Sequence, residues 1–246
     1  MTALVLTAHG SRDPRSAANA RAVARRVAAM RPGLEVRLAF CELNTPSLVD
    51  VLDGLPDCGR EAPKAIVTPL LLANAYHARI DIPRQIAGCP AAERVWRAPV
   101  LGEDPRLVSL LRRRVVELGV SRLDERLGVL VVAIGSSDPV ANARTAQVAA
   151  KLMAGTRWAG ATTAFVTRPE PSLAEGVDEL HRRGARRVVI APWFLAPGRL
   201  PDRVRVFAND AGIDMAQPLG AHGSVAETVL DRFDRALKAR AEHVAA

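Results

Sequence analysis

The sequence predicts an α/β protein in which one domain plan occurs twice, each time with a parallel four-stranded sheet. Short apolar runs of strand length alternate with longer amphipathic stretches, a pattern typical of parallel strands with helices on both faces. A sequence motif at residues 4–14 also recurs at residues 130–139, where an apolar run is again followed by Gly-Ser and Asp-Pro. We therefore expect an internal duplication with domains at residues 1–120 and 128–246.

The first half of the chain reads as four β–α units. Its opening strand ends at His9-Gly10. A helix then begins at Asp13-Pro14, because Asp caps free amides and Pro fits the first helical position. The expected elements are strands at residues 1–8, 34–41, 64–72 and 94–98 and helices at residues 15–30, 45–55, 80–87 and 104–118.

The second half repeats this order after a polar join at residues 119–128. Matching fragments recur in sequence, such as Ala-Phe followed by Pro-Ser-Leu at residues 39–48 and again at residues 164–173. The expected elements are strands at residues 129–133, 162–166, 187–192 and near residue 215 and helices at residues 140–153, 172–183, 202–211 and 225–241.

Aligning the two copies separates the residues of the scaffold from those that the scaffold does not need. Three polar residues of the first copy have an unreactive or less reactive counterpart in the second: His9 aligns with Ile134, Glu42 with Thr167 and His77 with about Leu200. A fold that forms without these side chains in one copy does not require them in the other. We therefore predict that the three side chains carry chemistry.

His9, Glu42 and His77 each follow a predicted strand, so all three fall at the carboxyl edge of one parallel sheet, where ligands bind in open α/β folds. Two imidazoles and a carboxylate suit a borderline divalent metal such as Fe, Co, Ni or Zn. The same groups accept protons near neutral pH. The residues alone leave metal binding and acid–base chemistry open.

Composition excludes several classes of protein. The formal net charge is +8, but aromatic residues make up only 4%, so the interleaved basic and aromatic surface of a nucleic-acid module is absent. No apolar run is long enough to span a membrane, and Met1 leads directly into a strand, so we expect a cytoplasmic protein. Cys41, Cys58 and Cys89 form no metal-binding or disulfide pattern and read as small core thiols.

Other reactive motifs have weaker readings. Neither a phosphate-binding P-loop nor a dinucleotide fingerprint occurs. Histidine phosphatases also place a His after the first strand, but there an Arg precedes it, whereas Ala8 precedes His9. His222 repeats the His-Gly-Ser letters but aligns with Asp104 at a helix start, which favours a helix cap over a second metal site. His181 and His243 read as surface residues.

Three motifs resemble the sirohydrochlorin chelatases of the CbiX/SirB type. They are Thr-Ala-His-Gly-Ser-Arg-Asp-Pro at residues 7–14, Glu-Leu with Pro-Ser-Leu at residues 42–48, and Pro-Leu-Leu-Leu-Ala-Asn-Ala-Tyr-His with Ile-Asp-Ile-Pro at residues 69–83. The resemblance covers nearly the whole chain and implies the long, two-domain form of these class II chelatases. It implies two chelatase-like domains of Rossmann or flavodoxin type, the second being a degenerate copy.

The resemblance also implies an activity, which is insertion of iron or cobalt into sirohydrochlorin without ATP, for siroheme or cobalamin. The enzyme would be a lyase-type ferrochelatase or cobaltochelatase, with iron favoured because the resemblance ties two-half members more often to siroheme than to cobalamin. His9 and His77 would handle the metal and Glu42 would assist. The metal, Fe²⁺, Co²⁺ or Ni²⁺, would be a substrate, and no organic cofactor is implied.

Such a reaction fits these residue types. Metal insertion removes two pyrrole protons, so bases must face the ring, and the substrate carries carboxylates that Arg binds well. The substrate-binding candidates within the motifs are Ser11, Arg12, Tyr76, Arg79 and Arg84. A nonenzymatic metal or tetrapyrrole carrier is the alternative. Because one chain holds both copies, we expect a monomer that is an internal pseudo-dimer.

Overall fold

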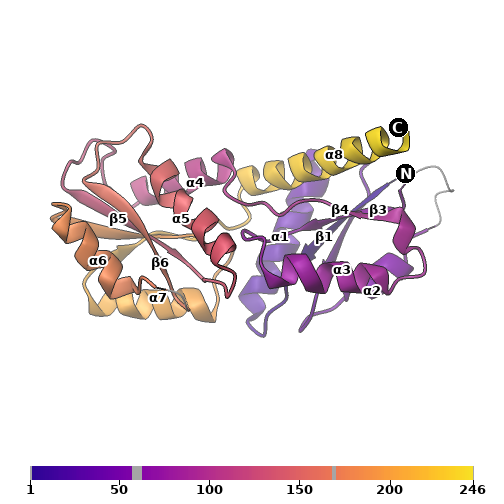
Figure 1. The fold of residues 1–246 in the computed structure, drawn as a ribbon, viewed down its shortest axis with the longest axis horizontal. Coiled ribbons are helices and arrows are strands. Elements are labelled where there is room, and N and C mark those ends of the chain that lie inside the picture. The colour runs from indigo at the N-terminus through magenta and orange to yellow at the C-terminus, as the bar shows by residue number, and fades with distance from the viewer. Residues whose placement is uncertain (1, 57–62, 168–169, 246) are drawn as a thin grey trace. The chain divides into compact units, whose positions relative to one another are not determined.

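Each repeat forms one parallel four-stranded sheet in the computed structural model, which describes residues 2–56, 63–167 and 170–245 (Figure 1). The predicted α/β fold and its internal duplication are confirmed. The first repeat contains the strands β1 (Ala3–Ala8), β2 (Val36–Phe40), β3 (Ala65–Pro69) and β4 (Val95–Arg97) and the helices α1 (Pro14–Met30), α2 (Leu48–Asp53), α3 (Ile82–Ala87) and α4 (Pro105–Val116). The second contains β5 (Leu127–Ala133), β6 (Gly160–Phe165), β7 (Arg187–Pro192), β8 (Asp214–Met215), α5 (Pro139–Met153), α6 (Leu173–Arg182), α7 (Arg199–Asp210) and α8 (Gly223–Ala245).

Strand order places a switch point beside β1. The first sheet has the order β2-β1-β3-β4 and the second has the matching order β6-β5-β7-β8, with all neighbours parallel. The chain leaves β1 on one side to form β2 and then crosses to the other side to form β3. In sheets of this kind, ligands bind outside the carboxyl ends of the strands where the direction of winding reverses.

Helices cover both faces of each sheet. In the first, α2 and α3 lie together on one face, where Leu48, Leu52 and Ile82 are buried against Val5 and Val67. The first turn of α1 has the predicted arrangement, since Asp13 caps the helix by accepting from Arg15 N and Pro14 follows it. The predicted helix at residues 80–87 begins earlier than expected, with a π-helical turn at His77–Asp81.

The chain folds into two compact units, and the last helix of each sequence repeat packs in the unit formed mainly by the other repeat: α8 belongs to unit 1, with the first sheet, and α4 belongs to unit 2, with the second sheet. Helix α8 lies against α1, β3 and β4, and helix α4 lies against α5 and β7, so each occupies the corresponding place (Figure 1). In unit 1, Arg31 at the end of α1 holds Asp234 of α8 through two hydrogen bonds of 2.5 and 2.6 Å. In unit 2, Arg112 of α4 donates to Leu152 O and Lys151 O at the end of α5, both at 2.9 Å.

The compact units therefore differ from the repeats that the sequence predicts as domains, residues 1–120 and 128–246. Unit 1 comprises Met1–Gly102 and Ala221–Ala246, and unit 2 comprises Glu103–Gly220. The difference has a physical reason, because an amphipathic helix requires an apolar surface to cover but does not encode which of two similar surfaces it covers. Among the described residues, no helix is long and apolar enough to cross a membrane.

Candidate active site

The ends of β1 and β2 bring two of the three predicted residues together. Beyond the last strand pair, the main chains stay in register, since Cys41 N donates to Ala8 O at 2.9 Å and Glu42 N donates to His9 O at 3.0 Å. The side chains then meet, with His9 Nε2 lying 3.3 Å from Glu42 Oε1. His9 is 35% and Glu42 54% exposed at the side chain, so the pair is open to a ligand from solvent.

Gly10 allows this close approach. Its φ is +101°, and an added Cβ would lie 1.8 Å from Glu42 O and 3.4 Å from Asn44 Oδ1. Only a residue without a side chain fits here, because both the backbone conformation and the contact exclude a Cβ. The glycine that follows His9 therefore sets the distance between the two strand-end loops.

The segment after β3 leads to the third predicted residue. Leu70 N donates to Thr7 O at 2.8 Å, which continues the β1–β3 ladder by one step. The chain then reaches the π-helical turn whose first residue is His77. The side chain of His77 lies outside the described part of the structure, so its role as a metal ligand stays a prediction. Single π-turns are found frequently at functional sites.

Two side chains that sequence reasoning missed support this edge of the sheet. Arg97 of β4 donates from Nη1 to Ala78 O in the π-turn at 2.6 Å, and burial lowers the pKa of Arg97, which still stays charged. Gln85 of α3 donates from Nε2 to Cys41 O at 2.9 Å. A bond that joins residues so far apart in the chain leaves no local sequence pattern.

Cys41 lies between β2 and Glu42, but its thiol is not activated as a nucleophile or a metal ligand. Burial, together with the nearby carboxylates of Asp81 and Glu42, raises the pKa of the Cys41 thiol to about 12. The thiol is therefore protonated at neutral pH, and the reactive thiolate is disfavoured. Cys89 is buried in the core, as its sequence reading predicts, whereas Cys58 lies outside the described residues.

The predicted substrate-binding residues lie in the segments that follow β1 and β3. Arg12 follows the His9 loop, and Arg79 and Arg84 lie on the π-turn and α3; all three are exposed. Arg84 Nη2 lies 3.6 Å from Asp81 Oδ1, a loose ion pair on an exposed side chain. Tyr76 is 57% exposed. Ser11 is partly buried, and its N–H donates to Asn44 Oδ1 at 2.7 Å. The assignment of these residues to a substrate stays a prediction.

Unit 2 has the same main-chain frame without the same side chains. Val166 N donates to Ala133 O at 2.9 Å and Thr167 N donates to Ile134 O at 3.0 Å, which reproduces the bonds at Cys41 and Glu42. The predicted alignment of His9 with Ile134 and of Glu42 with Thr167 is therefore confirmed. At this edge unit 2 presents an exposed Ile and a Thr hydroxyl, which donates to Ile134 O.

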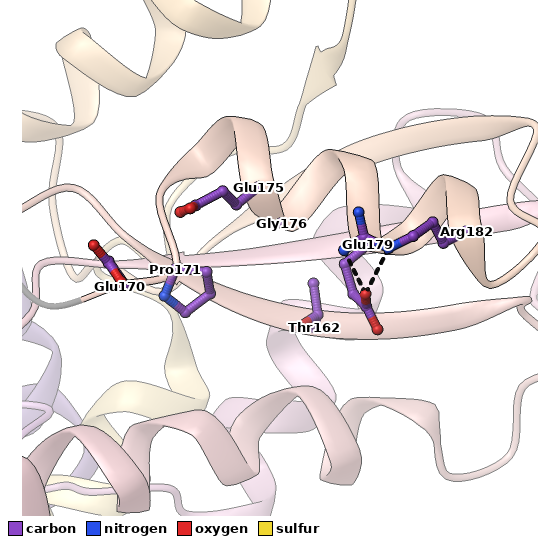
Figure 2. Close-up of a pocket in the computed structure, with 7 residues that line it drawn as sticks. All are labelled: Thr162, Glu170, Pro171, Glu175, Gly176, Glu179 and Arg182. Carbon is purple, nitrogen blue, oxygen red and sulfur yellow. Dashed lines mark hydrogen bonds and ion pairs between the residues drawn. The ribbon is translucent and has the colours of Figure 1, made fainter.

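A cavity of about 450 Å³ lies in unit 2, far along the chain from the predicted residues (Figure 2). Its lining comes from β6, α6 and the turn before α6 and consists of Thr162, Glu170, Pro171, Glu175, Gly176, Glu179 and Arg182. Glu179 is paired with Arg182 at 2.7 Å, and Glu175 holds the N-cap Ser172 at 2.7 Å. The carboxylates of Glu175 and Glu179 already bind groups of α6 and its N-cap, and together with Glu170 they would repel an anionic ligand.

The remaining histidines have structural contacts. His222 Nδ1 accepts from Ser224 N at 3.1 Å, so it caps α8 as Asp104 caps α4, which confirms the predicted helix cap. His181 Nδ1 lies 2.8 Å from Ala185 O, and His243 contacts the ring of Trp96. Among the side chains that the structure describes, no three of His, Cys, Asp or Glu gather as a ready metal site.

Comparison with known proteins decides the family. A family model described as CbiX matches residues 3–118 and 128–236, which is nearly the whole chain in two copies. The chain belongs to the CbiX family. The resemblance predicted from the motifs is thereby confirmed, and the two matched ranges correspond to the two sequence repeats.

Two relatives with nearly the same sequence identity to this chain are named for different metals. The chain is 28% identical over 238 residues to a sirohydrochlorin ferrochelatase of Priestia megaterium, covering 92% of this chain and 87% of that protein. It is 29% identical over 215 residues to a sirohydrochlorin cobaltochelatase of the same species, covering 83% of this chain and 67% of that protein.

Solved structures share the CbiX fold of this chain. SirB from Bacillus subtilis with Fe³⁺ has a TM-score of 0.80 at 24% identity, covering 99% of this chain and 98% of that one. SirB from Bacillus subtilis subspecies spizizenii in complex with cobalt has a TM-score of 0.76 at 23% identity, covering 97% of this chain and 96% of that one. At these identities the two likenesses show the fold alone.

Proposed function

We propose that the protein is a sirohydrochlorin chelatase that inserts Fe²⁺ into sirohydrochlorin, without ATP, to make siroheme. The observation that carries the proposal is the His9–Glu42 pair at the carboxyl edge of β1 and β2, with Nε2 and Oε1 3.3 Å apart. The pair lies beside the switch point of a CbiX fold, and the predicted metal-handling residue His77 begins the turn that follows β3.

Metal insertion requires groups that take protons and groups that take the place of water. The macrocycle loses two N–H protons for each divalent ion that it gains, so charge balances only if two protons leave. His9 is the group best suited to accept a pyrrole proton, because neutral imidazole is a base near physiological pH. Glu42 then stabilises the imidazolium across the 3.3 Å contact until the proton passes to solvent.

His77 completes the proposed site as a second imidazole. A divalent ion approaching the ring exchanges its water for protein ligands, and neutral imidazole binds borderline metals without holding them irreversibly. Arg12, Arg79 and Arg84 are exposed, follow β1 and β3 in the chain, and supply guanidinium groups for the carboxylates of the tetrapyrrole in this proposal. Ser11 and Tyr76 lie in the same two segments and contact the substrate in this proposal.

Iron is the proposed metal, and the relatives supply the argument. The ferrochelatase of Priestia megaterium aligns with 92% of this chain and 87% of its own length, against 83% and 67% for the cobaltochelatase. The two identities, 28% and 29%, do not separate the metals. Imidazole and carboxylate ligands bind either ion, so cobalt insertion is the second candidate function.

The test is a direct assay with purified protein, sirohydrochlorin and Fe²⁺ under anaerobic conditions, without nucleotide. We expect the absorbance change of metallation to be much faster than the spontaneous rate in a protein-free control. Parallel runs with Co²⁺ and Ni²⁺ rank the metals. If none of the three ions is inserted faster than in the control while the tetrapyrrole binds stoichiometrically, the protein is a carrier and not an enzyme.

Growth decides the physiological metal. We expect the gene to rescue a strain that lacks its siroheme chelatase, under conditions that require sulfite reduction. The matched control is a strain blocked at cobalt insertion in cobalamin synthesis. Rescue of the cobalamin strain alone would replace iron by cobalt in the proposal and leave the chelatase activity in place.

A further inference from the structure

The loops after β1 and β2 are joined by more than the His9–Glu42 contact. Glu42 N donates to His9 O at 3.0 Å, and the α-carbon of Gly10 approaches Glu42 O so closely that an added Cβ would lie 1.8 Å from it. The carbonyl of Glu42 thus lies against the loop that carries His9. The orientation of the Glu42 side chain depends on how the chain leaves this contact.

The chain leaves it through a strained turn. Leu43 has a φ of +63°, and Asn44 N donates to Glu42 O at 2.8 Å, which closes a three-residue turn around a left-handed residue. Such a turn is rare, and a left-handed conformation is unfavourable for a residue with a side chain. Leu43 is 54% exposed, so burial of its own side chain does not explain the conformation. Surrounding contacts must hold it.

Asn44 makes two such contacts, one through its main chain within the turn and one through its side chain to the loop of His9. Its main-chain N–H binds Glu42 O at 2.8 Å, and its side-chain Oδ1 accepts from Ser11 N at 2.7 Å. The side-chain bond joins residues 33 positions apart and crosses from one strand-end loop to the other. Asn44 is therefore the residue that fixes the strained turn to the loop of His9.

We propose that Asn44 is a positioning residue of the chelatase, which holds Glu42 beside His9 by bridging the two loops. The proposal rests on the proposed function for its catalytic consequence. Asn44 touches neither metal nor macrocycle in this scheme and acts only through the geometry of the pair. Loss of its side chain keeps the main-chain bond to Glu42 O but breaks the bond to Ser11 N, which frees the turn at Leu43 from the loop of His9 and lets the Glu42 carboxylate move away from the imidazole.

Unit 2 supplies a natural contrast. There Ser136, the counterpart of Ser11, donates its N–H to Asn142 Oδ1 at 2.9 Å and accepts from Asn142 Nδ2 at 2.6 Å. Asn142 lies only six positions along the chain, in α5, so this bond closes one loop on its own helix. The unit without the His–Glu pair fixes the same serine locally, whereas the unit with the pair fixes it across the two loops.

The experiment compares Asn44→Ala and Asn44→Asp with the matched control Asn142→Ala in the full-length protein. We expect Asn44→Ala to lower kcat about tenfold or more while KM for sirohydrochlorin stays within about twofold, because a displaced catalytic group costs turnover. Asn44→Asp keeps an acceptor at the same place and should restore kcat to within about threefold. Asn142→Ala should lose stability but keep kcat. Unchanged kcat in Asn44→Ala, or an equal loss in Asn142→Ala, overturns the proposal.

A second readout does not depend on the activity. In protein labelled at histidine, the ring resonances of His9, assigned by their loss in His9→Ala, should shift in Asn44→Ala and stay in place in Asn142→Ala. Resonances that do not shift in Asn44→Ala overturn the positioning role even if the protein proves not to be a chelatase. If Asn44→Ala does not fold, Asn44→Ser, whose hydroxyl is too short to span the loops, takes its place in both measurements.

Discussion

The two units have the same main-chain hydrogen bonds at the carboxyl ends of their first two strands but carry different side chains there. In unit 1 the residue after β1 is His9 and the residue bonded to it is Glu42, whereas in unit 2 the same bond joins Ile134 and Thr167, both at 3.0 Å. Because the frame is kept where the reactive groups are absent, the frame does not depend on them. The comparison therefore supports the prediction that His9 and Glu42 carry chemistry, and it assigns the hydrogen-bonded ladder to folding.

The units also differ in how the loop after their first strand is held. Unit 1 ties Ser11 to Asn44 on the neighbouring loop, and unit 2 ties Ser136 to Asn142 on the following helix. A local tie is sufficient to order a single loop. Unit 2 also joins its two loops, because the Thr167 hydroxyl donates to Ile134 O, so what distinguishes unit 1 is the partner of the serine: Ser11 N is held from the loop after β2, which also carries Glu42.

The largest effect on the rate of metal insertion is expected from replacing His9, whose counterpart in unit 2 is Ile134. His9→Ala should reduce the rate of metal insertion by about 10²–10⁴-fold, the usual contribution of a positioned base. Its matched control, Ile134→Ala, should leave the rate within about twofold. Stability should change little in His9→Ala, because unit 2 folds with an apolar residue at this position. An Ile134→Ala protein as slow as His9→Ala would show that the two edges are not functionally different.

A smaller effect, now on stability as well as rate, is expected at Gly10. Gly10→Ala should lower the free energy of unfolding by about 1–3 kcal/mol and separate the two loops, since φ is +101° and the new Cβ would clash with Glu42 O. Gly33→Ala is the matched control, because Gly33 has a φ of +88° with nothing within 4 Å of an added Cβ. Urea titration and the insertion assay measure both variants.

The two glycine variants separate strain from contact. Gly33→Ala should lose about 1 kcal/mol through its left-handed backbone and keep full activity. If Gly10→Ala loses no more stability than Gly33→Ala and inserts metal at the parent rate, the close approach at Glu42 has no role in the site.

The smallest effect is expected at His222, which repeats the letters around His9 but caps a helix. His222→Ala should lower the free energy of unfolding by about 1 kcal/mol, the usual value for a lost N-cap, and leave turnover within a few-fold. Chemical denaturation and the insertion assay check this expectation. A well-folded His222→Ala protein that is as inactive as His9→Ala would move the active site away from the β1–β2 edge.

Much of this arrangement follows from local pattern. The repeated Gly-Ser and Asp-Pro letters correctly predict the alignment of His9 with Ile134, and apolar runs correctly predict the strands. The bridge from Asn44 to Ser11 could not be predicted, because an amide that bonds a main-chain N–H 33 positions away leaves no periodic signal. The packing of α4 and α8 could not be predicted either, since two similar sheets offer the same apolar surface to an amphipathic helix.

The helix exchange has a consequence for the order in which the protein is completed. Unit 2 is one continuous segment, Glu103–Gly220, so all of its residues are synthesised before those of α8. Unit 1 combines residues that precede unit 2 with α8, which follows unit 2, and its Arg31–Asp234 pair closes across 203 positions. Closing so long a loop is slow, and domains fold as their segments become available. The unit that carries the candidate site is therefore completed after unit 2, and a chain that stops before residue 221 contains the site residues without the helix that closes their domain.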